Sequence, residues 1–194
     1  MSLLRSFVER IAGQRTAQKR WNERWADPAF YSEYRLDELA HYSILAGYAR
    51  TLRPGAAILD VGCGDGILRT HLHADAFSRY VGIDFPEAIA RASARADGRT
   101  SFAASDMRAY APSDKFGVIV FNESLYYVDE PIGELRRYSG FLEKDGVFLV
   151  SMHRKPKSER IWSDIAGAFA MVDRMTIANR AGVEWILGAF RPDS

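Results

Sequence analysis

Short apolar runs alternate with helical patterns along most of this 194-residue chain. Five apolar runs predict strands, at 56–61, 79–84, 100–104, 116–121 and 146–152. Between them, helical periodicity predicts three helices, near 66–74, 86–96 and 130–142. The connection around 106–112 breaks at Pro112, which leaves room for a turn or two of helix. Strands that alternate with helices in this way build βαβ units with a parallel sheet.

The C-terminal part of the chain departs from this alternation. A helical pattern begins at Ser158 and runs to about Ala168, and two apolar runs follow at 170–177 and 184–190. The few residues between these two runs are too few for a parallel crossover, so they predict an antiparallel hairpin. We therefore expect an α/β fold, a doubly wound sheet of seven strands. Its strands are mostly parallel, its C-terminal hairpin is antiparallel, and helices cover both faces.

Two helical patterns precede the first strand, at 3–25 and at about 33–52. We expect residues 1–53 to form a helical cap or lid and residues 54–194 to form the core, within a single domain overall. Residues 1–26 hold six basic and two acidic residues, a charge of +4, so the remainder is near −3 in a chain of net charge +1. A mildly acidic body predicts no nucleic-acid partner. The basic N-terminal helix, with its apolar positions, leaves a membrane-surface or protein contact open.

The cysteine and histidine residues predict neither a disulfide nor a metal site. Cys63 is the only cysteine in the sequence, so no internal disulfide and no cysteine-based metal site are expected. His71 and His73 fall late in a predicted helix, where surface positions favour a cation. No metal site is predicted. The N-terminus lacks the pattern of a secretory signal and no apolar run reaches membrane-spanning length, which predicts a cytoplasmic protein.

Residues 58–66, with the sequence ILDVGCGDG, form an apolar strand that ends in glycines and opens directly into a helix. Glycine lets the backbone turn sharply and approach a ligand closely. The free N–H groups at the start of the following helix favour anionic ligand groups. A ligand there lies at the carboxyl end of the first strand, the usual binding position of an open α/β sheet. The candidate ligand contacts are Asp60, Gly62, Cys63 and Gly64.

The loop differs from two other glycine-rich loops. A dinucleotide loop needs glycine or alanine at its third site, where this chain has Ile67. Asp60 also lies inside the strand, where dehydrogenases have an apolar residue. No Gly-Lys-Ser/Thr sequence follows, so the loop is not a P-loop. A nicotinamide-dependent oxidoreductase of Rossmann type remains the alternative.

The ILDVGCGDG segment resembles the signature loop of class I S-adenosylmethionine-dependent methyltransferases, and the similarity extends over about residues 30–191. The resemblance implies a Rossmann-like seven-stranded sheet, which agrees with the strand pattern. It also implies S-adenosyl-L-methionine as cofactor, S-adenosyl-L-homocysteine as product, and no metal.

Two further groups of candidate cofactor contacts follow along the chain, at residues 84–85 and 106–107. Asp84 ends the second strand, 20 residues beyond Gly64, where a carboxylate binds a ribose diol, and Phe85 is placed to pack on the adenine. The resemblance implies that Asp106 binds the adenine amino group and that the backbone of Met107 contacts the ring. The alternatives are a solvated strand end for Asp84 and a helix cap for Asp106.

The acceptor side is expected just past the fourth strand, at residues 122–127, NESLYY. This stretch lacks the Asn-Pro-Pro-Tyr pattern of enzymes that methylate nucleobases or amides, and it resembles small-molecule methyltransferases, including those that modify sugars and secondary metabolites. Candidates for catalysis are Tyr126, Glu123 and His153. Asn122 and Tyr34 complete the expected cofactor contacts, with Tyr34 as part of a lid or as a packing residue.

The sequence thus predicts an enzyme that moves a methyl group from S-adenosylmethionine to a small-molecule acceptor by in-line displacement. Besides the oxidoreductase, a non-catalytic module that binds S-adenosylmethionine remains an alternative. The pattern predicts neither the acceptor atom nor the oligomeric state.

Overall fold

The computed structural model describes residues 38–193 together with Lys19, Glu23 and Leu36. The chain divides into two compact units, Met1–Asp37 and Glu38–Ser194. In the first unit, Lys19 and Glu23 are helical, and their charged groups lie 4.0 Å apart. Apart from Lys19 and Glu23, the predicted helix at 3–25 lies outside the described residues. Tyr34 and the predicted start of the second helix at residue 33 also lie outside them. The division into a cap at 1–53 and a core from 54 therefore stays a prediction.

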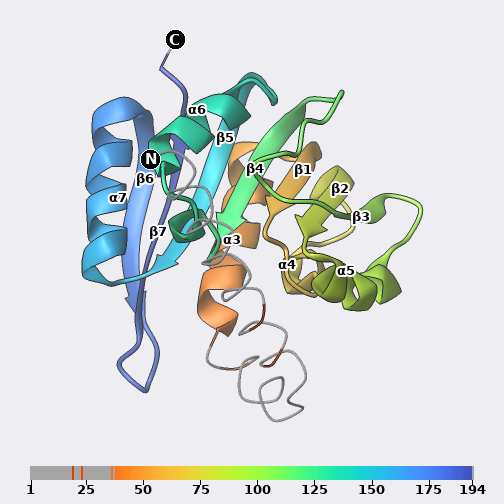
Figure 1. Ribbon diagram of the computed structural model, residues 1–194, viewed down its shortest axis with the longest axis horizontal. Coiled ribbons are helices and arrows are strands. Elements are labelled where there is room, and N and C mark those ends of the chain that lie inside the picture. Colours follow the sequence, from red (N-terminus) through yellow and green to blue (C-terminus); the bar gives the residue numbers. More distant parts are fainter. Residues whose placement is uncertain (1–18, 20–22, 24–35, 37, 194) are drawn as a thin grey trace, which may run out of the picture. The chain divides into compact units, whose positions relative to one another are not determined.

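The second unit is built on a seven-stranded sheet with the order β3-β2-β1-β4-β5-β7-β6. Strands β1 to β5 pair in parallel, and β7 is antiparallel to both of its neighbours. Figure 1 shows the sheet with helices flanking it. The predicted Rossmann-like fold class is confirmed. The strands are β1 Ala56–Val61, β2 Phe77–Asp84, β3 Thr100–Ala104, β4 Phe116–Asn122, β5 Leu142–His153, β6 Ala170–Ala178 and β7 Glu184–Arg191.

Three of the described helices begin with proline, whose missing N–H costs nothing at a first helical position. No helix among the described residues is both long enough and apolar enough to cross a membrane. The helices are α3 Leu39–Leu52, α4 Ile67–His71, α5 Pro86–Ala92, α6 Pro131–Ser139 and α7 Pro156–Ala168, with 3₁₀ turns η1 Ser93–Arg95 and η2 Leu125–Tyr127.

The predicted helical surface positions of the two neighbouring histidines are confirmed only in part. Helix α4 ends at His71, so His73 lies beyond the helix, where it is exposed. His71 is half-buried, because its ring stacks on the ring of Tyr42 with centroids 5.5 Å apart. His71 therefore lies in the last turn of α4 as predicted, but Tyr42 of α3 partly covers it.

Strand β5 begins earlier than predicted, at Leu142 rather than at residue 146. In the pairing with β4, Leu142 lies opposite Phe116, but Val147 lies opposite Val118. The additional residues of β5 between these two pairs form a bulge. Asp145 takes a φ of 63° there. Asp145 and Gly146 form a pair that is typical of turns, but here both lie within the strand. A β-bulge satisfies the same backbone preference as a turn.

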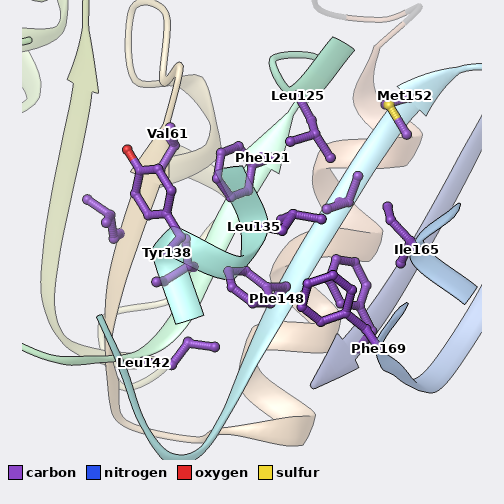
Figure 2. Close-up of a cluster of buried hydrophobic side chains, with 14 of the residues drawn as sticks. Val61, Phe121, Leu125, Leu135, Tyr138, Leu142, Phe148, Met152, Ile165 and Phe169 are labelled. Carbon is purple, nitrogen blue, oxygen red and sulfur yellow. The ribbon is translucent and has the colours of Figure 1, made fainter. Parts of the chain in front are cut away.

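The core surrounds the central strands. All seven residues of β4 are buried, as expected for a parallel strand covered on both faces. Figure 2 shows Phe121, Leu135, Tyr138, Phe148 and Phe169 in the cluster that packs α6 and α7 onto the sheet. With the middle of the strands fixed in this core, the carboxyl ends of β1, β2, β4 and β5 meet at one edge. This edge holds the candidate site.

Candidate active site

The glycine loop after β1 has the conformation that its sequence predicts. Gly62, Gly64 and Gly66 have φ values of 78°, 57° and 81°, which other residues adopt only with strain. The backbone N–H groups of Gly62 and Cys63 donate to the carbonyl of Ile83, at 2.9 and 3.0 Å. A Cβ added to Gly62 would lie 2.5 Å from the Cβ of Ser124. The loop is therefore fixed between the ends of β2 and β4.

Asp84 at the tip of β2 connects directly to this loop. Its Oδ2 accepts the N–H of Gly64 at 2.8 Å, and its Oδ1 accepts the N–H of Phe85 at 2.6 Å. Burial raises the pKa of Asp84, while these two backbone donors lower it. Each carboxylate oxygen keeps a further lone pair. The structure thus brings two predicted site residues, Asp84 and Gly64, into contact.

Asp60 in β1 is fully buried, and only one of its carboxylate oxygens has a partner. Oδ2 accepts a hydrogen bond from the hydroxyl of Tyr80, whereas Oδ1 has no partner among the described residues. Burial raises the pKa of Asp60 to about 7, against the lowering effect of the Tyr80 hydrogen bond. A buried oxygen without a donor costs free energy, so Oδ1 is a ready position for a donor group of a ligand.

Cys63 has a structural environment. Its side chain is buried, and burial raises the pKa of the thiol well above its usual range. The Sγ atom would lie 2.8 Å from a Cβ added to Gly82, so the thiol fills the space beside β2. Any ligand contact at this position therefore comes from the backbone of Cys63.

Asp106 and Met107 follow β3 in a short turn. The carboxylate of Asp106 accepts the backbone N–H of Arg108 at 3.0 Å and its Nε at 2.9 Å, and this pairing lowers the pKa of Asp106. Asp106 therefore caps a turn at residues 107–109, where the alternative interpretation assumed a helix. The carbonyl of Met107 accepts from Arg137 at 2.5 Å and from the hydroxyl of Tyr138 at 2.8 Å. The role of both residues toward adenine stays a prediction.

The three candidate catalytic residues meet at one carboxylate oxygen. Oε2 of Glu123 accepts the hydroxyl of Tyr126 at 2.9 Å and lies 3.0 Å from Nδ1 of His153. Burial lowers the pKa of His153, but the interaction with Glu123 outweighs it, so that the net shift is upward. Burial and the neighbouring Glu123 raise the pKa of Tyr126, which keeps this phenol a hydrogen-bond donor. Oε1 of Glu123 has no partner among the described residues.

Asn122 takes part in a second, largely buried arrangement. Its Oδ1 lies 2.9 Å from Nδ1 of His41, and Nε2 of His41 lies 2.6 Å from Oε2 of Glu38. The ring of His41 stacks on the indole of Trp185 with centroids 5.3 Å apart. The ring of His153 also stacks on Trp185, at 4.9 Å. Trp185 thus links the two carboxylate–imidazole pairs at this edge of the sheet.

The comparison with protein families shows to which family the chain belongs. Residues 31–190 match the family model described as a methyltransferase domain. The chain belongs to this methyltransferase family. The class I resemblance of the ILDVGCGDG loop is confirmed, and the oxidoreductase alternative receives no support.

Individual relatives of the methyltransferase domain agree with this assignment. A trans-aconitate 2-methyltransferase of Streptomyces avermitilis is 32% identical over 142 residues, covering 68% of this chain and 52% of that protein. The chain therefore spans about half the length of this curated relative. The N-methyltransferase NodS of Bradyrhizobium japonicum, crystallised with S-adenosyl-L-homocysteine, shares the fold with a TM-score of 0.76 at 22% identity, over 91% of this chain and 98% of NodS. The cyclase SpnF also shares it, with a TM-score of 0.63 at 18% identity, over 78% of this chain and 81% of SpnF.

The sequence analysis gave no role to two residues that contact the candidate site, His41 and Trp185. His41 received no role, yet it is buried on the same face of α3 as Leu45 and Ala49. A histidine in register with apolar positions of a helix was the available signal. Nothing in the sequence indicated Trp185, because its contacts come from strand pairing. Among the residues the structure describes, no group of three or more His, Cys, Asp or Glu side chains is placed to hold a metal ion.

Proposed function

We propose that this methyltransferase domain moves a methyl group from S-adenosylmethionine to a small-molecule acceptor by in-line displacement, with S-adenosylhomocysteine as product. The carrying observation is the hydrogen bond from the N–H of Gly64 to Asp84, beside the unpartnered buried Oδ1 of Asp60. This combination places two carboxylates and a glycine turn at the carboxyl ends of β1 and β2, where open α/β sheets bind ligands.

The residues present fit the chemical groups of this cofactor. Asp84 has lone pairs for the two hydroxyls of a ribose, and Asp60 Oδ1 is a buried acceptor for an amino group. The positive φ values of Gly62 and Gly64 let the backbone approach a ligand without a side chain between. Asp106, Met107 and Phe85 are the proposed adenine contacts, and Cys63, Asn122 and Tyr34 are the remaining proposed contacts.

When bound, the cofactor supplies an activated methyl group on a sulfonium, so it carries the difficult chemistry. The chain's own residues then hold the acceptor in line and exclude water, and orientation of this kind lowers a barrier by about 7–11 kcal/mol. Glu123 directly follows β4, and the next residue, Ser124, contacts the glycine loop. Tyr126 and His153 lie within 3.0 Å of the Glu123 carboxylate. We propose that they form the acceptor side.

Relatives do not identify the acceptor. One relative is named for trans-aconitate and a structural neighbour is named as an N-methyltransferase, so a carboxylate-bearing and a nitrogen acceptor both occur among them. A sugar or another secondary metabolite stays a proposal, as do a contact through the basic N-terminal helix and a cytoplasmic location. The class of the methyl acceptor therefore has to be inferred from the residues of this chain's own site.

A methyl-transfer assay tests the proposal. Purified protein is incubated with S-adenosylmethionine that carries a labelled methyl group and with a fractionated small-molecule extract. We expect label in an extract fraction together with stoichiometric S-adenosylhomocysteine. Binding of the cofactor without any transfer would favour the non-catalytic alternative, which is relevant because a cyclase shares this fold. Binding of a nicotinamide cofactor in preference to S-adenosylmethionine would contradict the proposal.

A further inference from the structure

Glu123 has an unusual backbone conformation. It directly follows β4 and takes a φ of 54°, in the left-handed region that costs free energy for a residue with a Cβ. Its N–H donates to the carbonyl of Ser151 at 2.9 Å, which holds this conformation in place. Strained non-glycine residues of this kind concentrate at functional sites. The strained residue is Glu123, whose side chain belongs to the candidate site at this edge of the sheet.

Burial of the Glu123 carboxylate is a second, independent source of unfavourable free energy. The side chain of Glu123 is only 10% exposed. Both hydrogen-bonding neighbours, Tyr126 and His153, meet Oε2, and Oε1 is buried without a partner among the described residues. A buried carboxylate oxygen without a donor is destabilising. A ligand that brings a donor to Oε1 would remove this cost.

Glu123 also lies next to the loop that we propose to hold the methyl donor. The hydroxyl of the following residue, Ser124, donates to the carbonyl of Val61 at 2.6 Å. The Cβ of Ser124 occupies the space that a side chain at Gly62 would need. The end of β4 and the glycine loop are therefore in direct contact. Glu123, whose Oε1 has no partner among the described residues, precedes the residue that contacts the proposed methyl-donor loop.

We propose that the methyl acceptor is a protonated amine, which binds through its ammonium N–H to Oε1 of Glu123 and gives up a proton to the Glu123–His153 pair. This inference rests on the proposed function and names the substrate class of the same site. The ammonium first gives a proton to the Glu123–His153 pair, which leaves a lone pair on nitrogen. This lone pair then forms the bond to the methyl carbon, while the bond from that carbon to sulfur breaks and sulfur keeps its electron pair. The proton lost from nitrogen resides on Glu123 or His153. The side chain of His153 is 28% exposed, which gives that proton a route to solvent.

Other acceptor classes fit this carboxylate less well. An anionic carboxylate acceptor would place two like charges together at a buried position, which is unfavourable. An aliphatic alcohol brings no charge to Glu123 and is far too weak an acid for an imidazole–carboxylate base. An amine and a phenol both titrate near pH 10, within reach of such a base, but only the ammonium form also supplies the positive charge that a buried carboxylate attracts.

The test uses the 194-residue chain loaded with S-adenosylhomocysteine, with loading verified by calorimetry. Methylammonium, methanol and acetate are titrated as probes while the imidazole proton signals of His153 are followed by NMR, assigned with His153→Asn. We expect saturable shifts from methylammonium at concentrations at least about tenfold below those needed for the other two probes. Failure to load would count against the proposed function, whereas loading without a methylammonium response would overturn only this inference.

Matched variants make the test specific to Oε1. Glu123→Gln keeps an amide oxygen for Tyr126 and His153 but replaces the free acceptor by a donor, and we expect the methylammonium response to vanish while loading persists. Glu143→Gln is the control, because Glu143 pairs with Arg53 near the start of β5, far along the strand from His153; it should leave the response unchanged. Equal responses in both variants, or tighter binding of acetate than of methylammonium, would overturn the inference.

Product chemistry gives a second readout. Methyl label from ¹³C-labelled S-adenosylmethionine is located in the product by NMR. A methyl group on nitrogen supports the inference, and Glu123→Gln should then lower kcat/KM for that amine by roughly 100-fold, the scale of a lost general base. A methyl ester or a methyl ether as the product would overturn it.

Discussion

The backbone N–H of Gly64 donates a hydrogen bond of 2.8 Å to the carboxylate of Asp84, across 20 residues of sequence. This bond joins the glycine turn after β1 to the tip of β2. It orients the acid and fixes the turn at the same time. The sequence analysis proposed the same two residues as contacts of an adenosyl ligand. The proposed cofactor site depends on this relationship.

A pair of glycine substitutions should have opposite effects on stability. Gly62→Ala places a Cβ 2.5 Å from the Cβ of Ser124 at a φ of 78°, so we expect a loss of more than about 2 kcal/mol in the free energy of unfolding. Gly167→Ala places a Cβ in open space within α7, and we expect a gain of roughly 0.5–1 kcal/mol. Denaturant unfolding measures both. Equal effects would show that the loop is not packed against β4.

Affinity for S-adenosylhomocysteine should depend on pH through Asp60. Its pKa is raised to about 7, so below this pH the carboxyl is neutral and attracts an ammonium group weakly. We expect affinity to rise with pH up to about 7, by as much as roughly tenfold per pH unit. Asp60→Asn should weaken binding and remove the dependence.

Tyr80→Phe provides the second arm of this experiment. The hydroxyl of Tyr80 lowers the pKa of Asp60 by hydrogen bonding to it, so its loss should move the midpoint of the affinity profile to higher pH. Calorimetric titrations over a series of buffers give the profile. A profile that is flat in the native protein, or unmoved by Tyr80→Phe, would contradict the assignment of the buried acid.

Removal of His41 should be far more costly than removal of an exposed charge. His41→Ala leaves the buried carboxylate of Glu38 without its partner and opens a void beside Trp185, which should cost about 3–5 kcal/mol in unfolding free energy. Asp114→Asn breaks the exposed pair with Arg79 and should cost under about 1 kcal/mol. Unfolding of both variants in urea measures the difference. A native-like stability of His41→Ala would mean that the buried pair contributes nothing.

Local sequence was sufficient to predict the elements whose causes are local. The strand ends at Val61 and Asp84 follow from apolar runs closed by glycine or by an acid, and the hairpin of β6 and β7 follows from the short connection between them. The bulge at Asp145 could not be distinguished from a turn, because both use the same Asp-Gly preference and differ only in whether pairing with β4 continues.

The acceptor side depends on long-range neighbours and was predicted only in part. Glu123 and His153 were each predicted as catalytic candidates, but their pairing at 3.0 Å was not predicted. The stacking of His41 on Trp185 joins α3 to β7 across most of the chain. No pattern within either segment specifies that contact, because it results from strand order and from the packing of α3 on the sheet.

Calorimetric titration of S-adenosylhomocysteine into the native protein and into Asp84→Ala tests the central claim most directly, with Asp114→Ala as the control at an exposed acid. We predict saturable binding to the native protein and to the control. We predict at least roughly tenfold weaker binding to Asp84→Ala, or about 1.4 kcal/mol. A folded native protein that binds no S-adenosylhomocysteine, or an Asp84→Ala variant with unchanged affinity, would contradict the account.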